Sequence, residues 1–85
     1  MSRDEIKHIV IESIREESTL AEGAGVAESM SARDVPGWDS LAHVRIMLGI
    51  EMELDIEVPS ERTYRAETVG QLIDLVAATV NDRRN

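Results

Sequence analysis

Apolar residues recur at helical spacing in three segments of this chain, and this periodicity predicts an all-α fold. Ser2 and Glu5 open the first segment with the residue types of a capping box, in which each side chain bonds the backbone N–H of the other residue. The apolar positions that follow are Ile6, Ile9, Val10 and Ile14. We expect this first helix to end near Glu17 or Ser18.

A second helix is expected from Ser40 to Leu54, with Asp39 as its N-cap. Its apolar residues cover more than one stripe: Leu41, Val44, Met47, Leu48, Ile50, Met52 and Leu54. Such coverage predicts a central helix that packs against several neighbours, with Met47 and Met52 as adaptable core fillers. Gly49 costs this helix about 1 kcal/mol of propensity relative to alanine, and we expect it to let another helix approach closely.

Two further helices are expected after Pro59. Residues Ser60 to Arg65 should form a short helix that bears Tyr64. Thr68 and Gln71 have capping-box spacing and open the last helix. Its inward positions are expected to be Val69, Leu72, Ile73, Val76 and Val80. The prediction is a four-helix bundle of three main helices and one short helix.

The connection from Thr19 to Trp38 is long for a compact domain. Its glycines and prolines argue against a regular helix there. Its scattered apolar residues are Leu20, Val26, Met30 and Val35. We therefore expect the segment to pack against the bundle, with a turn around residues 27–31.

Composition narrows the possible functions. A length of 85 residues predicts one domain, 1–85, and the absence of cysteine excludes a disulfide framework and fits a cytoplasmic location. Seventeen acidic residues against nine basic ones give a net charge of −8, which disfavours nucleic acid and favours partners with basic patches. No apolar run is long enough to span a membrane, and the first residues do not resemble a signal peptide.

Ser40 lies on the first turn of the second predicted helix, directly after Asp39. The first N–H groups of a helix lack partners within the helix, and its macrodipole leaves partial positive charge at that end. A phosphate attached to Ser40 would therefore lie where the backbone favours an anion. The sequence thus predicts that Ser40 is suited to carry a phosphorylated group.

The run from Gly37 to Val44, the acidic end of the same helix and the Ile56-Glu57-Val58-Pro59 exit together resemble the acyl carrier protein family. In that family the serine of an Asp-Ser-Leu motif carries covalent 4'-phosphopantetheine, taken from coenzyme A. The resemblance implies an acyl-carrier-protein-like four-helix bundle. It assigns the motif to Asp39, Ser40 and Leu41, with Ser40 as the attachment site.

The resemblance also implies a function. The chain would be a monomeric carrier, not an enzyme, that delivers thioester-bound substrates of a fatty-acid, polyketide or other specialised pathway. Its partners would be a phosphopantetheinyl transferase and the enzymes that load and transfer acyl or aminoacyl groups. The acidic residues that these partners would contact are Glu51, Glu53, Asp55 and Glu57. Arg45 departs from the acidic pattern of fatty-acid carriers and would weaken docking by an enzyme with basic residues there.

Two other functions are compatible with the same residues. The chain could be an aminoacyl or peptidyl carrier, or a small helical protein-interaction domain without a prosthetic group. Ser40, His43 and Asp39 share one helix start, but they lack the glycines of a nucleophile elbow and a strand before it, so we expect no catalytic residue. The acidic residues lack the spacing of a calcium loop, so we expect no metal site.

Overall fold

The computed structural model describes residues 1–20 and 23–84, with side chains up to residue 82. Its four helices are α1 (Arg3–Glu17), α2 (Ser40–Leu54), α3 (Ser60–Arg65) and α4 (Val69–Arg84). A 3-10 turn, η1 (Ala32–Asp34), lies between α1 and α2. The described residues contain no strand, so the predicted all-α bundle of three main helices and one short helix is confirmed. Within those residues no helix is both long and apolar enough to cross a membrane.

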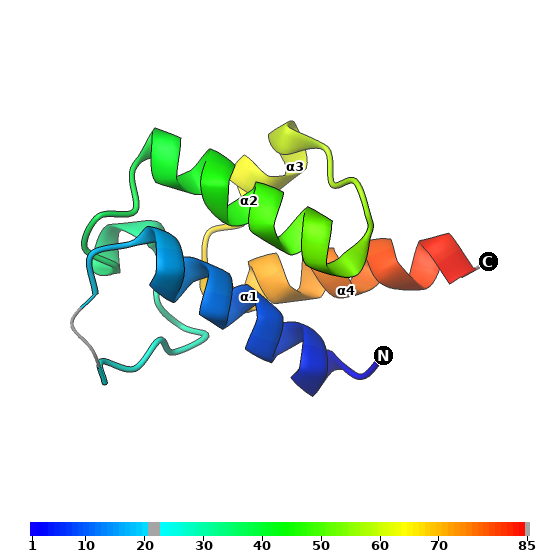
Figure 1. The fold of residues 1–85 in the computed structure, drawn as a ribbon, viewed down its shortest axis with the longest axis horizontal. Helices are drawn as coiled ribbons and strands as arrows, with labels where there is room; N and C mark the ends of the chain where they lie inside the picture. Colours follow the sequence, from blue (N-terminus) through cyan, green and yellow to red (C-terminus); the bar gives the residue numbers. More distant parts are fainter. Residues whose placement is uncertain (21–22, 85) are drawn as a thin grey trace.

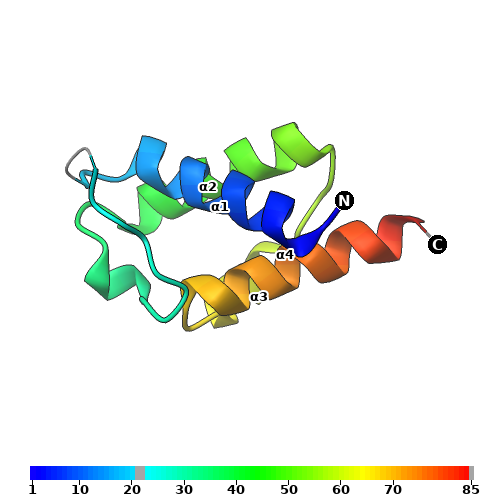
Figure 2. The ribbon, with the colours of Figure 1, turned by 90° about the horizontal axis from the view of Figure 1, so that it is seen from below.

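The helices are arranged so that α2 begins far from both chain termini. α1 and α2 lie side by side and run in opposite directions (Figure 1). α4 packs against α1 and against the short α3, as the second view shows (Figure 2). The N- and C-termini lie at one end of the molecule, and the long connection between α1 and α2 lies at the other. The start of α2 is therefore presented at the loop end of the bundle.

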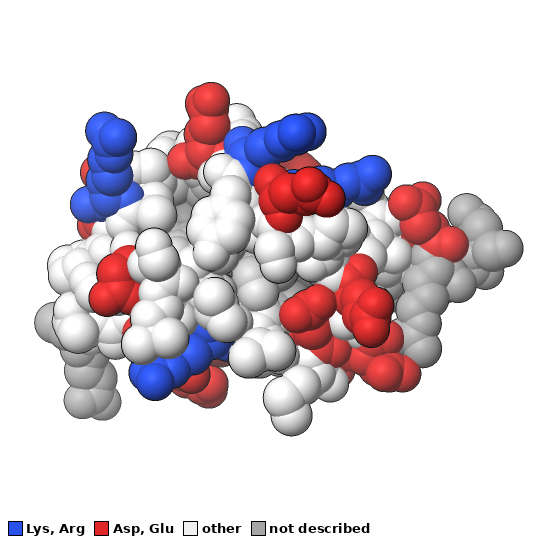
Figure 3. Space-filling model, turned by 90° about the horizontal axis from the view of Figure 1, so that it is seen from above, with Lys and Arg blue, Asp and Glu red and all other residues white. Residues whose placement is uncertain are grey.

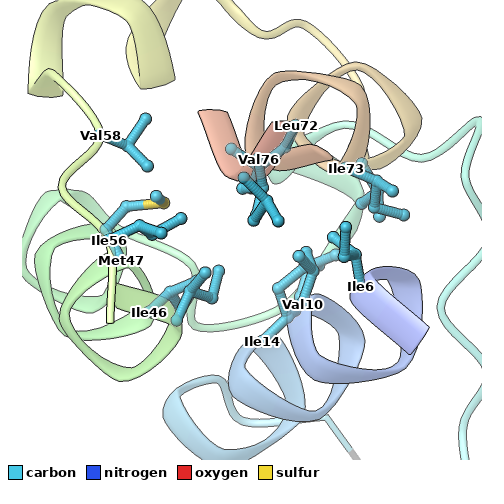
Figure 4. Close-up of a cluster of buried hydrophobic side chains, with 14 residues drawn as sticks. Ile6, Val10, Ile14, Ile46, Met47, Ile56, Val58, Leu72, Ile73 and Val76 are labelled. Atoms are coloured by element: carbon cyan, nitrogen blue, oxygen red, sulfur yellow. The ribbon is translucent and has the colours of Figure 1, made fainter. Parts of the chain in front are cut away.

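The core is almost entirely aliphatic, because the chain has no phenylalanine. Side chains from three helices and from the α2–α3 connection meet at its centre (Figure 4). The members labelled there are Ile6, Val10, Ile14, Ile46, Met47, Ile56, Val58, Leu72, Ile73 and Val76, all buried. Every inward position expected on α4 is buried, so the periodicity identified the core face of that helix correctly.

The helix starts use the caps that the sequence predicted, with one difference. Ser2 and Glu5 form the full capping box of α1, and the Asp39 carboxylate accepts from the backbone N–H of Ala42 at 2.8 Å. At α4 the Thr68 hydroxyl accepts from Gln71 N at 3.1 Å, as expected. The Gln71 side chain, however, accepts from Glu67 N instead of Thr68 N, so only half of that capping box forms.

α1 and α2 approach each other closely at Gly49. A Cβ at this position would lie 2.9 Å from Oγ of Ser13, which is a steric clash. The Ser13 hydroxyl is buried and donates to the carbonyl oxygen of Ile46 at 2.8 Å. The close approach expected at Gly49 is therefore confirmed, and α1 is the helix that uses it.

The connection between α1 and α2 packs on the bundle, as expected. Met30 N donates to Ala27 O at 3.1 Å, which confirms the turn expected around residues 27–31. The carbonyls of Met30 and Glu28 then accept from the first N–H groups of α4, those of Val69 and Gly70, each at 2.8 Å. The connection thus caps α4. The turn η1 that follows was not predicted.

The expectation that α2 packs against several neighbours is confirmed, since its side chains contact α1, α3 and the common core, but one side of the helix is exposed. Four of its large apolar side chains face solvent, with exposed fractions of 59% for Leu41, 47% for Val44, 52% for Leu48 and 81% for Met52. Met47 is buried as expected, but Met52 fills no gap in the core. Apolar periodicity showed which residues belong to the helix, and it could not show that one of its stripes is exposed.

Candidate functional site

Ser40 is the first residue of α2, and its side chain is exposed. Asp39 precedes it in extended backbone conformation, and its carboxylate bonds Ala42 N. The Asp39 carbonyl accepts from His43 N at 2.9 Å, which is the first bond of the helix. These bonds fix the orientation of the helix start. Among the described residues, no hydrogen-bond partner holds the Ser40 hydroxyl against the protein.

The electrostatics of the α2 start suit an anion. The helix has 15 residues, long enough to develop a macrodipole, and its first turn contains no acidic residue. Asp39 is the one carboxylate adjacent to Ser40 in the chain, and it is already engaged as the N-cap. Unpaired N–H groups and the positive end of the dipole therefore act together beside the Ser40 hydroxyl.

An exposed apolar strip runs along α2 from this point. We define it by Leu41, Val44, Leu48 and Met52, which recur at helical spacing on one side of the helix. Figure 3 shows the face formed by α2 and α3, with uncharged surface in its middle and acidic side chains gathered toward the end where α2 finishes. A strip of this kind beside an exposed serine is typical of an interaction surface.

His43 points into the protein and is only 8% exposed. Its Nδ1 accepts from the indole N–H of Trp38 at 3.1 Å, and its Nε2 lies 2.9 Å from Oγ1 of Thr63. Because Nδ1 is an acceptor, the neutral ring carries its proton on Nε2 and donates it to Thr63. The Thr63 hydroxyl in turn donates to the carbonyl of Ser60 at 2.7 Å. Burial lowers the pKa of His43, which favours this neutral form.

These bonds leave His43 without a ring nitrogen for Ser40, so it is not positioned to act as a general base. The imidazole instead stacks against Trp38 and Tyr64, with ring centroids 6.0 Å and 4.4 Å away. Trp38 packs against the core. Sequence reasoning missed the pairing with Thr63, because nothing in the spacing of two residues 20 positions apart reports a hydrogen bond.

The residues expected to meet partner enzymes differ in their surroundings. Arg45, Glu53, Asp55 and Glu57 are exposed. Glu51 is half-buried, and its carboxylate accepts from Val58 N at 2.8 Å, so it holds the α2–α3 connection in place. Asp55 ends α2 in the left-handed conformation, with φ of 54°. Glu51 therefore has a structural role in addition to its place at the acidic end of the helix.

A shallow groove between α1 and α2 brings Glu53 close to residues of α1. Its volume is about 250 Å³, and Glu53 lines it together with Glu12 and Glu16. These carboxylates do not form a metal site, since no cluster of three or more ligand residues occurs among the described residues. Glu12 and Glu53 thus belong to the same face of the bundle.

Comparison with known proteins identifies the family of this chain. The chain is 31% identical over 78 residues to an acyl carrier protein of Prochlorococcus marinus, covering 92% of this chain and 96% of that protein. It is 32% identical over 73 residues to an acyl carrier protein of Caulobacter vibrioides, covering 86% and 87%. The chain belongs to the acyl carrier protein family. No family model matches it, and no solved structure matches it.

Membership of the family confirms the resemblance read from the Asp39-Ser40-Leu41 motif. It also agrees with the helical bundle. As a member of this family, the chain has the general role of a carrier protein. The structure adds where the motif lies: at an exposed helix start, beside the exposed apolar strip and away from the chain termini.

Proposed function

We propose that this chain carries 4'-phosphopantetheine on Oγ of Ser40 and presents acyl substrates to the enzymes of a biosynthetic pathway. The observation that carries the proposal is the exposed Ser40 at the positive end of α2, in a member of the acyl carrier protein family. Residues 1–85 would act as one carrier domain. When bound, the group supplies a terminal thiol that holds the acyl cargo as a thioester.

The described residues fit such a group. A phosphodiester on Ser40 would face the unpaired N–H groups of the first turn of α2, where the helix dipole favours its negative charge. The bond from Asp39 to Ala42 N keeps this turn formed, and Leu41 stands exposed next to the attachment point. A Lys or Arg side chain is not required to hold the phosphate, since the backbone supplies the donors.

Attachment would use the Ser40 hydroxyl as the nucleophile. A bond forms between Ser40 Oγ and the phosphorus of coenzyme A that bears the pantetheine, and the bond from that phosphorus to the 3',5'-ADP part breaks. The hydroxyl proton leaves to a base of the transferase. The exposure of Ser40 allows this enzyme to reach it, and His43 takes no part because both of its ring nitrogens are engaged.

Partner enzymes would dock on α2. The exposed apolar strip offers area that leaves water on binding, and Glu53, Asp55 and Glu57 offer negative charge at the far end of the helix. Opposite charge on the enzyme would accelerate encounter more than it would strengthen the complex. Arg45 interrupts the negative surface and would select against enzymes that present basic groups near Ser40.

The test is intact mass after incubation with coenzyme A and a broad-specificity phosphopantetheinyl transferase. Wild type should gain the mass of one phosphopantetheine, and Ser40→Ala should gain none while keeping its helical circular dichroism. Ser60→Ala is a matched control, because Ser60 is also exposed and also begins a helix. Loading of Ser40→Ala, or loss of loading in Ser60→Ala alone, would refute the assignment.

A second readout concerns the cargo. An aminoacyl or peptidyl carrier would have the same helix start and the same attachment chemistry. Incubating the loaded protein with acyl-activating and with amino-acid-activating enzymes separates these two functions by the mass of the product. An unmodified interaction domain would instead bind its partner equally well with and without coenzyme A.

A further inference from the structure

The exposed apolar strip of α2 is symmetric about one of its residues, Leu48. Val44 and Met52 lie four residues before and after Leu48, and all three side chains are exposed on one side of the helix. Leu41 extends the strip by one turn toward the helix start. Because the pattern around Leu48 is the same in both directions, this surface can pack against a second copy of itself that runs the opposite way.

The two halves of α2 differ in charge. Residues 40–48 contain one arginine, Arg45, and no acidic residue. Residues 49–57, which include the exit from the helix, contain no basic residue and four acidic ones, Glu51, Glu53, Asp55 and Glu57. The helix dipole increases the contrast, because its positive end lies at the start of α2 and its negative end at the acidic side.

These charges determine how two copies would fit together. In an antiparallel pair centred on Leu48, the acidic half of each α2 lies over the half of the other helix that carries Arg45 and the positive end of the dipole. In a parallel pair the acidic halves would lie against each other, which is unfavourable. Charge complementarity thus favours the antiparallel pair, with the two apolar strips in contact at its centre.

We propose that the unmodified chain forms a weak homodimer through the exposed apolar strip, with the two α2 helices antiparallel and Leu48 at the twofold axis. The partner on this surface is a second copy of the chain. The dimer covers Leu41 and Val44, which follow Ser40 closely, so a second copy and a docking enzyme compete for the same side of α2. Self-association itself does not depend on the proposed attachment at Ser40.

The association should be weak, because one face of one helix supplies the contact. Interfaces that bury less than about 1,200 Å² are typical of transient complexes. Each copy also has a net charge of −8, which opposes association at long range, although salt at about 0.15 M screens charges more than about 8 Å apart. We expect a dissociation constant on the order of 0.1 mM.

A group attached at Ser40 should weaken the dimer. In the antiparallel pair the start of each α2 lies over the acidic end of the other helix, so a phosphodiester on Ser40 would meet Asp55 and Glu57 of the second copy. Bringing like charges together is unfavourable. This one step rests on the proposed function, and it predicts that the protein carrying the arm is more monomeric than the unmodified protein.

Sedimentation velocity of the unmodified chain, from about 10 µM to about 1 mM at about 0.15 M salt, covers the expected dissociation constant. Wild type should shift from monomer to dimer. Leu48→Glu places two like charges at the twofold axis and should weaken association at least about tenfold. Arg45→Glu should weaken it too, whereas Arg33→Glu, in the exposed turn η1, changes the net charge equally and should have a smaller effect. Circular dichroism checks that each variant stays folded.

Disulfide trapping tests the direction of the pair, because the chain has no cysteine of its own. Packed helices have axes about 8–10 Å apart, which brings the Cα atoms of two facing residues within the roughly 7 Å that a disulfide can span. With oxidised glutathione as oxidant, Leu48→Cys should therefore form a disulfide-linked dimer. Leu41→Cys is the matched control, since the two copies of this residue would lie about 21 Å apart in the antiparallel pair but face each other in a parallel one.

Each result has a clear consequence. A monomer at every concentration would overturn the inference and leave the strip to partner enzymes alone. Equal linking of Leu41→Cys and Leu48→Cys, or equal association of the loaded and unmodified proteins, would overturn the antiparallel arrangement. Failure of any arm to attach would instead refute the proposed function and leave the result on the unmodified dimer intact.

Discussion

The indole Nε1–H of Trp38 donates to Nδ1 of His43 at 3.1 Å, and this bond joins the segment before Ser40 to the interior of the bundle. Trp38 lies two residues before Ser40, the proposed attachment site, whereas His43 reaches Thr63 of α3. The position of the loop, of α2 and of α3 therefore depends on one neutral imidazole ring. Disturbing this ring should affect the start of α2 as well as the packing of α3.

The stability of the fold should depend on pH through His43. Burial lowers its pKa in the folded chain below the ordinary value of about 6.5, so between the two values the unfolded chain binds more protons. The contribution of neutral His43 is therefore present above about pH 6.5 and is lost as the pH falls toward the lower folded pKa. Protonation would also place an N–H on Nδ1, facing the donor of Trp38.

The measurement is urea unfolding of wild type and His43→Gln at about pH 7.5 and about pH 5.5, on either side of the ordinary pKa. The difference in unfolding free energy between the two proteins should shrink at the lower pH. Glu51 and Glu67 line small cavities on either side of the ring, and both residues are present in the two proteins that are compared. His8, exposed on α1, supplies the control His8→Gln. An unchanged difference would show that His43 keeps its ordinary pKa.

Gly49→Ala should destabilise the fold although alanine is the better helix former. The new Cβ would lie 2.9 Å from Oγ of Ser13, and overpacking of this kind costs more than the gain in propensity, for a net loss of about 1 kcal/mol. Removing the clashing oxygen with Ser13→Ala should reduce the cost of Gly49→Ala. A double-mutant cycle by chemical denaturation measures this coupling. Gly25→Ala, where a Cβ meets nothing within 4 Å, is the neutral control.

Local signals in the sequence determined much of the fold correctly. The capping box of Ser2 and Glu5 and the N-cap at Asp39 located the helix starts, because capping depends on residues close in the chain. The inward face of α4 followed from periodicity. The sequence predicted that another helix approaches closely at Gly49, and the structure confirms this, with Ser13 of α1 as the neighbour.

Features that depend on distant residues were not predictable. Met52 is exposed because no helix among the described residues covers that side of α2, and no pattern within α2 reports this. The bond from His43 to Thr63 and the bond from Glu51 to Val58 N depend on how α3 and its connection fold back. The motif located the candidate attachment residue, and the tertiary structure added the exposed apolar strip beside it.

Glu51 should matter for stability, and Glu53 should not. The Glu51 carboxylate accepts from Val58 N, and Glu51→Ala would leave that N–H without its partner. The site is half-buried, so the loss in unfolding free energy should be about 1 kcal/mol, below the range for fully buried charged partners. Exposed Glu53→Ala should change it by less than about 0.5 kcal/mol. If urea unfolding gave equal losses of unfolding free energy for Glu51→Ala and Glu53→Ala, the structural role of Glu51 would be contradicted.

Charge reversal away from Glu51 tests the docking surface without this loss of stability. Glu53→Lys and Glu57→Lys should each slow modification of Ser40 by a transferase with a basic docking patch severalfold at low salt, and the effect should fade as salt screens the charges. Arg45→Glu should have the opposite effect, because it extends the negative surface toward Ser40. Initial rates followed by intact mass measure all three.

The control for these reversals must lie away from α2. Glu12 is unsuitable, because it lines the same groove as Glu53. Asp4 is exposed in the first turn of α1, and Asp4→Lys changes the net charge by the same amount as Glu53→Lys or Glu57→Lys. The rate at which the transferase modifies Ser40 in Asp4→Lys should stay near that of wild type if the enzyme recognises the surface of α2. Equal slowing by Asp4→Lys would mean that the transferase responds to the overall charge of the carrier, and the docking surface on α2 would then be refuted.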